Sequence, residues 1–100
     1  MILEIAQLQV VAGRTTEFEA AFRTAQAIIS AAPGHVSHEL NRCVEDPDAY
    51  VLLVRWKSLH DHEEGFRKSA PYLEWKRLLH HFYGSAPIVL HYEAVHAAGK

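Results

Sequence analysis

The sequence has little of what marks a secreted or membrane-spanning chain. Its one cysteine, Cys43, cannot form an internal disulfide. No apolar run approaches the roughly 18–20 residues needed to cross a bilayer. No basic stretch precedes the apolar residues at the N-terminus, so we expect no signal peptide. These absences predict a soluble, cytoplasmic protein that does not insert into a membrane.

An excess of charge of either sign is also missing. Ten lysines and arginines against twelve acidic residues leave a formal charge of -2, so we expect neither a nucleic acid nor an anionic membrane as partner. Hydrophobic residues make up 49% of the chain and argue against disorder. Because 100 residues is the length of one domain, we expect a single domain over residues 1–96 and a flexible tail over residues 97–100.

Periodicity divides the chain into four strands and two helical regions. Alternation of apolar and polar residues, or β-branched and aromatic runs, predicts strands over residues 2–11, 36–44, 50–56 and 88–95. Apolar residues at steps of three and four predict helices over residues 18–32 and 59–82. Thr16 with Glu19 has the spacing of a capping box. Ser58 with Asp61 marks a second helix start, and Ser69 marks a restart within the second region.

The order of elements, βαββαβ, predicts an α+β fold of the ferredoxin-like kind. Two crossovers around one hairpin give a four-stranded antiparallel sheet with both helices on one face. The other face has no helix to cover it, although it must carry apolar residues such as Val51 and Leu53. Uncovered apolar surface usually marks an interface, so we expect a homodimer that packs through its sheets.

The unusual count is eight histidines, which raises the question of a metal site. They include three close pairs: His35 and His38, His60 and His62, and His80 and His81. Residues one or two apart on a helix point about 100° or 200° away from each other, and His35 and His38 would face opposite sides of a strand. Because metal ligands must converge on one point, we expect no metal.

Familiar catalytic and cofactor motifs are absent as well. There is no G-x-S-x-G, no glycine-rich phosphate loop and no dinucleotide fingerprint. Cys43 lies within a predicted strand and has no signature of a nucleophile, so we interpret it as an inert thiol. We therefore expect no organic cofactor bound by a standard motif.

Aromatic residues and histidines gather in the second half of the chain. Trp56 ends the third strand, with Leu52 and Val54 on the same face, and His62 follows in the next helix. We predict an apolar pocket for a flat aromatic molecule, in which Trp56 forms a wall and His62 is the base, kept neutral by burial. Further pocket residues are expected to be Phe66, Tyr72, Trp75, His80 and Tyr83.

Two simpler interpretations stay open for these residues. The helical spacing of Trp75 and Phe82 is also what a core stripe requires. His60 is expected to be solvated at the helix start, although it is the alternative to His62 as the base.

Short motifs along nearly the whole chain, from residue 2 to residue 95, resemble the antibiotic biosynthesis monooxygenase family. The matching residues are Gly13, Phe18-Glu19, Pro33-Gly34, the stretches 51–58 and 65–69, and Tyr72. The resemblance implies a dimeric ferredoxin-like α+β barrel. It implies an enzyme such as the oxygenases that convert phenols and hydroquinones to quinones with molecular oxygen and no metal, flavin or haem. The family that the sequence resembles also includes quinol monooxygenases, haem-degrading enzymes and a signal-molecule isomerase.

The site residues of the family carry over only in part. The tryptophan at the end of the third strand is Trp56, but Leu52 and Ala6 stand where the oxygenases carry asparagines. Neither side chain can donate a hydrogen bond. The haem degraders' asparagine, tryptophan and histidine would fall at Ala6, at Gly65 or Phe66, and near Lys76, which disfavours haem degradation.

Three hypotheses follow for the function. The first is a cofactor-independent monooxygenase of a small aromatic substrate, with Trp56 as wall, His62 as base and Tyr72 or His80 as orienting donors. The second is a non-redox enzyme such as an isomerase, in which the histidine moves a proton beside a carbonyl. The third is a dimeric ligand-binding module without chemistry.

Overall fold

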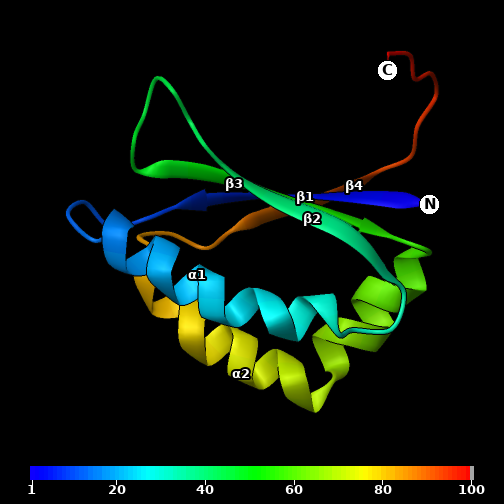
Figure 1. Ribbon diagram of the computed structural model, residues 1–100, viewed down its shortest axis with the longest axis horizontal. Coiled ribbons are helices and arrows are strands. Elements are labelled where there is room, and N and C mark those ends of the chain that lie inside the picture. Colours follow the sequence, from blue (N-terminus) through cyan, green and yellow to red (C-terminus); the bar gives the residue numbers. More distant parts are fainter. Residues whose placement is uncertain (100) are drawn as a thin grey trace.

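The structure is a computed structural model that describes residues 1–99 and contains one sheet and one layer of helices (Figure 1). The strands are β1 (Ile2–Gln9), β2 (His35–Arg42), β3 (Ala49–Trp56) and β4 (Ile88–Tyr92). The longer helices are α1 (Thr15–Ser30) and α2 (Ala70–Leu79). Three short turns accompany them, the π-helical η1 (Asp61–Gly65) and the 3-10 helical η2 (Phe66–Lys68) and η3 (His80–Phe82).

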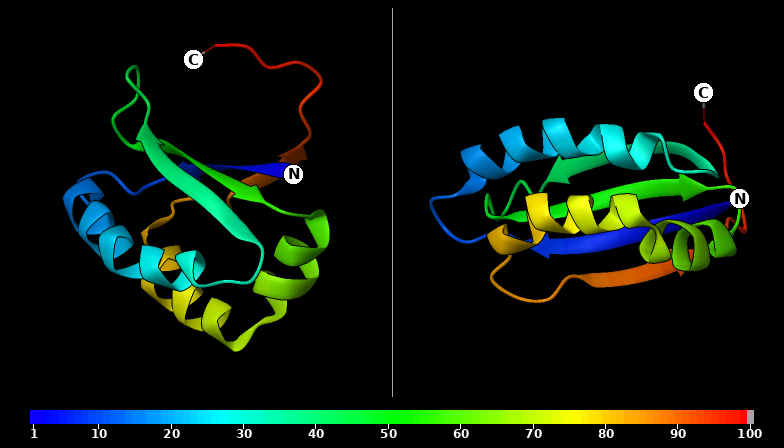
Figure 2. Two further views of the ribbon diagram at one scale, coloured as in Figure 1. Left: turned by 45° about the vertical axis from the view of Figure 1, so that its right-hand side comes forward. Right: turned by 90° about the horizontal axis from the view of Figure 1, so that it is seen from below.

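The sheet has the order β2-β3-β1-β4, and all three pairings are antiparallel. Both long helices lie on the same face of it (Figure 2). The predicted ferredoxin-like arrangement, including the hairpin of β2 and β3, is therefore confirmed. β1 lies in the interior of the sheet between β3 and β4, so its inward side chains reach the middle of the core.

Alternation along the strands determines which side chains enter that core. On β1 the buried positions are Glu4, Ala6 and Leu8, whereas Gln7 and Gln9 are exposed. α1 closes the core from the helix side with an apolar stripe every three to four residues: Phe18, Phe22, Ala25 and Ile29. One of the inward positions on β1 is thus an acid, which the apolar pattern does not explain.

The first strand was predicted to end at Val11, but β1 ends at Gln9. The backbone amides that follow Gln9 donate hydrogen bonds to other segments. The amide of Val10 donates to the carbonyl of Asp48, and the amide of Val11 donates to that of Phe82. These bonds tie the end of β1 to the hairpin loop and to η3 in place of a continued ladder.

The bounds of the other two strands also differ from prediction. β4 stops at Tyr92 and not at Val95, because Tyr92 already pairs with Leu3, next to the start of β1. β2 covers 35–42 and not 36–44, and the amide of Cys43 closes the hairpin by donating to the carbonyl of Ala49. Residues 93–99 form neither helix nor strand.

The helix starts agree with two of the three predicted caps. Ser69 accepts a hydrogen bond from the amide of Tyr72, and Ser58 accepts one from the amide of Asp61. The capping box of Thr16 and Glu19 is not formed, because α1 already begins at Thr15 and Thr16 therefore lies inside its first turn. The segment after Ser58 continues as η1 and η2 and not as a regular helix, with the change at Gly65.

His35 and His38 correct the prediction that they face opposite sides of a strand. The register between β2 and β3 shifts between His35 and Ser37, which is the signature of a β-bulge. The extra residue turns the two rings to the same side, where Nε2 of His35 lies 2.8 Å from Nδ1 of His38. Within residues 1–99, no group of three or more histidine, cysteine or acidic side chains is placed to hold a metal.

The sheet face opposite the helices carries apolar side chains in the open, as predicted. Ile88, Leu90 and Tyr92 of β4 are 57%, 51% and 47% exposed, and Val51 and Leu53 of β3 are half-buried. Among residues 1–99, no helix is long and apolar enough to cross a membrane.

Candidate active site

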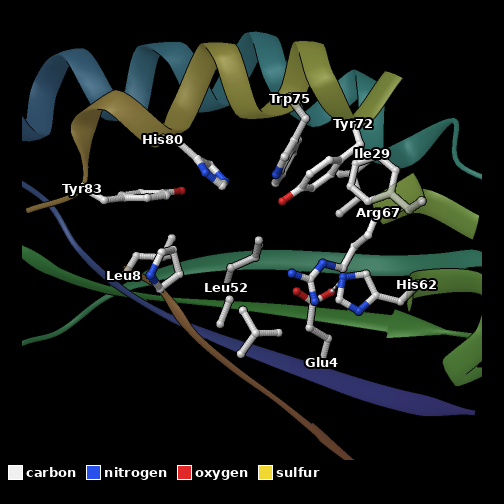
Figure 3. A pocket seen from close by; sticks show the side chains of 14 residues that line it. Glu4, Leu8, Ile29, Leu52, His62, Arg67, Tyr72, Trp75, His80 and Tyr83 are labelled. Atoms are coloured by element: carbon white, nitrogen blue, oxygen red, sulfur yellow. Dashed lines mark ion pairs between the residues drawn. The ribbon is translucent and has the colours of Figure 1, made fainter. Parts of the chain in front are cut away.

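A cavity of about 120 Å3 lies between the sheet and the helices (Figure 3). Strands form one side of it, and α1, α2 and the turns around α2 form the other. Its lining residues are Glu4, Ala6, Leu8, Ile29, Leu52, His62, Phe66, Arg67, Tyr72, Trp75, His80, Tyr83, Pro87 and Val89.

The sheet side of the cavity is apolar at its centre. Ala6 pairs with Leu52 of β3 and with Val89 of β4, so these three side chains form one row across the sheet. The methyl group of Ala6 is the smallest of the three and leaves space above β1. Polar groups lie toward the two ends of the cavity, with Glu4, His62 and Arg67 at one end and His80 and Tyr83 at the other (Figure 3).

Glu4 is a buried acid with one engaged oxygen. The side chain follows the alternation of β1 into the core and leaves the residue 5% exposed. The indole Nε1 of Trp56 donates to its Oε1 at 2.9 Å. Burial raises the pKa of Glu4 to about 7, although the Trp56 hydrogen bond and the charge of Arg67 act in the opposite direction. At neutral pH this carboxyl is therefore present in both its acid and its base form.

His62 lies against both Glu4 and Trp56. Its ring stacks on the indole of Trp56 with centroids 5.2 Å apart and planes 16° apart. Its Nε2 lies 3.4 Å from Oε1 of Glu4, and its Nδ1 lies 2.7 Å from Nε2 of His91. Burial, with the charges of His91 and Arg67, lowers the pKa of His62 to about 4. His62 is thus neutral at pH 7, and both of its ring nitrogens have partners.

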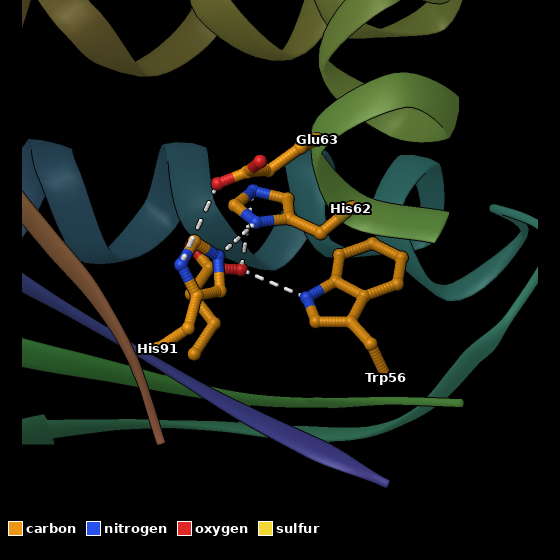
Figure 4. A network of polar contacts seen from close by, with 5 residues as sticks. Trp56, His62, Glu63 and His91 are labelled. Carbon is orange, nitrogen blue, oxygen red and sulfur yellow. Dashed lines mark hydrogen bonds and ion pairs between the residues drawn. The ribbon is translucent and has the colours of Figure 1, made fainter. Parts of the chain in front are cut away.

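These contacts continue to the surface (Figure 4). His91 stands directly opposite Glu4 in the pairing of β1 with β4, and this register brings its ring to His62. On its other side, Nδ1 of His91 lies 3.8 Å from Oε1 of Glu63. The side chain of Glu63 is 46% exposed, so the polar chain runs from the buried acid to solvent.

The opposite end of the cavity holds a second set of polar aromatic groups. The ring of His80 lies 5.4 Å from that of Tyr83 and 6.3 Å from that of Tyr72. Burial lowers the pKa of His80, with smaller effects from nearby cations, and burial raises the pKa of Tyr83. His80 and Tyr83 therefore remain neutral hydrogen-bonding groups near pH 7 and suit a polar substituent on a ligand.

Most of the predicted pocket residues line this cavity, namely Leu52, His62, Phe66, Tyr72, Trp75, His80 and Tyr83. Val54 and Trp56 do not, because both are fully buried in the core beneath it. The prediction that Trp56 forms a wall is therefore wrong. Trp56 acts on the cavity indirectly, through its hydrogen bond to Glu4 and its stacking on His62. His60 is exposed, as predicted.

Three polar residues in or beside the cavity were missed from the sequence: Glu4, Arg67 and His91. Alternation held a signal for two of them. Glu4 has the same parity as the apolar Ala6 and Leu8, which places it on the inner face of β1. In the same way, His91 has the parity of Val89 on β4. Nothing in the local sequence distinguished Arg67 from other surface cations.

Comparison with known proteins identifies the family. The sequence profile described as antibiotic biosynthesis monooxygenase matches residues 1–78. The chain belongs to this family.

Individual proteins and solved structures also match over nearly the whole chain. The uncharacterized protein YczJ of Bacillus subtilis (strain 168) is 48% identical over 95 residues, which are 95% of this chain and 100% of that protein. A candidate antibiotic biosynthesis monooxygenase from Bordetella bronchiseptica is 35% identical, with a TM-score of 0.91 over 94% of this chain and 96% of that one. SnoaB, a cofactor-independent oxygenase from Streptomyces nogalater, has the same fold at 20% identity, with a TM-score of 0.85 over 99% of this chain and 97% of that one.

In this protein the polar side chain on the sheet side of the cavity is not at either of the positions that the family resemblance implies. The positions implied to be asparagine in the oxygenases, Ala6 and Leu52, form the apolar middle of the cavity and pair with each other across β1 and β3. The polar group on β1 is instead Glu4, two residues earlier on the same face. An acid that titrates near neutrality thus stands beside the implied asparagine position.

Proposed function

We propose that the protein oxidises a small phenol or hydroquinone with one aromatic ring to a quinone, using molecular oxygen as co-substrate and no metal or organic cofactor. The observation that carries this proposal is Glu4, a carboxyl whose pKa burial raises to about 7 and which lines the cavity between the sheet and the helices. A general base is most effective when its pKa lies near the working pH. Membership in a monooxygenase family supports the oxidative outcome.

The reaction begins with proton transfer from the ring hydroxyl to the carboxylate of Glu4. The resulting phenolate gives one electron to oxygen, and the phenoxyl radical and superoxide combine through a new carbon–oxygen bond at a ring carbon that bears hydrogen. The peroxide takes up a proton. Loss of the proton from that carbon then breaks the oxygen–oxygen bond, leaves a carbonyl and releases water. One phenol and one oxygen molecule thereby give one quinone and one water.

Glu4 and not His62 is the base in this proposal. Both ring nitrogens of His62 already contact other side chains, and its low pKa makes it a weak base. We assign it and Trp56 to holding Glu4 in place, since both contact Oε1 of the carboxyl. Oε2 of Glu4 has no hydrogen-bond partner among the described side chains and is the oxygen left for substrate.

The other cavity groups would stabilise charge and orient the ring. Arg67 lies beside the carboxyl of Glu4, where a cation favours a phenolate and a reduced oxygen species (Figure 3). We assign Tyr72 and His80 to hydrogen bonds with substituents at the far end of the ring. Phe66 and Trp75 would contact the ring, as would Leu52.

The size of the cavity supports a substrate with one ring. A cavity of about 150 Å3 in an engineered protein binds benzene, and the cavity here measures about 120 Å3. A fused three-ring substrate would remain largely outside it. We therefore expect one-ring phenols to be preferred to polycyclic ones.

A non-redox isomerase is the second candidate, and one observation favours it. The cavity lacks amide donors at Ala6 and Leu52, where the resemblance implies that the oxygenases carry them. A carboxyl with a pKa near 7 serves equally well to move a proton beside a carbonyl. In that reaction Glu4 removes a proton from one carbon and returns it to another, with no change of oxidation state.

We also propose that the functional unit is a homodimer joined through the open sheet face. Apolar side chains from three strands gather on this face: Leu3, Ile5, Val51, Leu53, Ile88, Leu90 and Tyr92. Burying such a patch against a second copy removes it from water. The helix-side cavity lies on the other side of the sheet and stays open in such a dimer.

The decisive experiment measures oxygen uptake and quinone absorbance with a one-ring hydroquinone and, in parallel, with a three-ring anthracene diol. We expect enzymatic turnover of the one-ring compound that exceeds its autoxidation and that rises with pH through about 7, as Glu4 loses its proton. Glu4→Gln should lower kcat/KM by at least about 100-fold. His60→Gln is the matched control and should react like the unchanged protein.

Other results would point to the other hypotheses. Loss of a carbonyl-adjacent proton to deuterated solvent, without oxygen uptake, would support the isomerase. Thermal stabilisation by ligand with no product in either assay would support a binding module. Turnover that survives Glu4→Gln would refute Glu4 as the base.

A further inference from the structure

A series of polar side chains that the reaction itself does not require leads from Glu4 to solvent. The exposed fraction of the side chain changes from 7% at Glu4 and 5% at His62 to 17% at His91 and 46% at Glu63. The successive nitrogen and oxygen atoms are 3.4, 2.7 and 3.8 Å apart (Figure 4). Such a series needs three separate segments, β1, η1 and β4, to meet at one place.

The fold brings these segments together by two independent features. The register of β1 against β4 sets His91 directly opposite Glu4 on the inner face of the sheet. The first turn after β3 then places His62 over both, with its ring stacked on Trp56. The next residue, Glu63, reaches the solvent side of His91. His91 therefore lies between a buried group and an exposed one.

The polar contacts of this series allow two arrangements of the protons. When Glu4 is a carboxylate, Nε2–H of His62 points to Glu4 and Nε2–H of His91 donates to Nδ1 of His62. When Glu4 is protonated on Oε1, the acid donates to Nε2 of His62, and Nδ1–H of His62 donates to Nε2 of His91. One form becomes the other when a proton moves one step along the whole series. The neutral tautomers exchange, and no positively charged His62 has to form.

We propose that His62 and His91 form a proton relay through which Glu4 exchanges its proton with solvent at Glu63 while a ligand fills the cavity. The inference rests on the proposed function in one respect, which is that Glu4 is the proton acceptor. A ring bound in the cavity displaces the water that would otherwise reach Glu4. Trp56 closes another side and cannot serve as a route, because its indole only donates.

Proton balance along the relay is simple. The substrate proton first binds the carboxylate of Glu4. Once the acid carries its proton on Oε1 and the histidines carry theirs on Nδ1, Oε1 releases its proton to Nε2 of His62. Nδ1 of His62 passes a proton to Nε2 of His91, and Nδ1 of His91 loses one to Glu63 or water. The reverse sequence returns a proton to the cavity. Arg67 of η2 is the charged group beside the buried end, on the cavity side, and His80 of η3 lies toward the far end of the cavity.

The first test needs neither ligand nor turnover. In 15N-histidine-labelled protein, the tautomers of His62 and His91 are read from the shifts of their ring nitrogens between pH 5 and pH 9. We expect the ring of His62 to carry its proton on Nδ1 at low pH and on Nε2 at high pH, with a midpoint near that of Glu4. Glu4→Gln should abolish the switch, and His60→Gln should leave it unchanged. A single tautomer of His62 across the range would overturn the relay.

The second test uses the one-ring hydroquinone assay. His91→Gln keeps an N–H that can donate to His62 but cannot pass a proton on, so we expect kcat to fall at least about tenfold with little change in KM. His91→Ala should show the same loss, and added imidazole should restore its activity. Normal turnover in His91→Gln would refute the relay. A loss of activity in His91→Ala that imidazole does not restore would refute it as well. A tautomer switch in a protein that oxidises no phenol would instead refute the proposed function and leave the relay standing.

Discussion

Replacing Glu4 with glutamine should change how the stability of the protein depends on pH. Glutamine has the shape of the acid and can still accept the hydrogen bond from the indole of Trp56. It carries no proton to release. The substitution therefore removes the titration of Glu4 while it preserves the packing around a residue that is 5% exposed.

The magnitude follows from the pKa of Glu4. Burial raises that pKa from 4.5 to about 7, and a tenfold change in acid dissociation corresponds to about 1.4 kcal/mol. Between these two pH values the folded protein holds a proton that the unfolded chain has released. The free energy of unfolding of the unchanged protein should therefore fall by about 3 kcal/mol, from this group, as pH rises from 4.5 to about 7. Relative to the unchanged protein, the unfolding free energy of Glu4→Gln should therefore increase by about 3 kcal/mol between pH 4.5 and about 7.

The contribution of His62 to stability depends on pH in the opposite sense and provides an internal check. Its pKa is lowered from 6.5 to about 4, so the stability that its neutral form gives is present above pH 6.5 and is lost as pH falls toward 4. In the unchanged protein the two groups oppose each other in mildly acidic solution. In Glu4→Gln only the histidine remains, and stability should decline steadily below pH 6.5.

The assay is urea unfolding, followed by tryptophan fluorescence, at pH values from 4 to 9. The matched control is Glu45→Gln, an exposed acid in the loop between β2 and β3. We expect the curve of the control to run parallel to that of the unchanged protein. A constant difference between Glu4→Gln and the unchanged protein across this range would show that Glu4 titrates normally and would refute the reasoning about its burial.

Three further predictions concern the surroundings of the site and the sheet. Trp56→Phe removes the N–H that donates to Oε1 of Glu4 and that lowers its pKa, so the midpoint of Glu4, followed by 13C NMR of the carboxyl, should move to higher pH. The unfolding free energy should fall by about 1–3 kcal/mol, and an unmoved midpoint would mean that the indole does not act on the carboxyl. Leu52→Phe projects extra volume into a cavity of about 120 Å3, so binding of a one-ring phenol measured by calorimetry should be lost, whereas Leu53→Phe on the opposite face should bind as before. Leu90→Glu places a charge on the open sheet face. Light scattering should then find a dimer for the unchanged protein and a monomer for Leu90→Glu. A monomer in both cases would refute pairing through the sheets.

Sequence patterns were sufficient for the elements and for most of the cavity. Alternation identified the inward side of β3, and helical spacing brought Tyr72, Trp75 and His80 to the layer that faces it. The same alternation would have shown Glu4 on the inner face of β1, but an acid among apolar neighbours was not interpreted as a site residue. The prediction that Trp56 forms a wall of the pocket was wrong. Periodicity tells which face of the sheet a side chain occupies, but it does not tell whether a cavity lies next to that side chain.

The order of strands and helices, and the face on which each side chain lies, were determined by the sequence alone, because local backbone geometry decides side-chain direction with a period of two or about 3.6 residues. The meeting of Glu4 with His91 was decided only by the register between β1 and β4, which lie at opposite ends of the chain. The bulge that joins His35 to His38 was likewise set by pairing with β3. The unusual protonation of Glu4 and His62 has the same origin, since water is excluded from them only when the sheet and the helices have packed together.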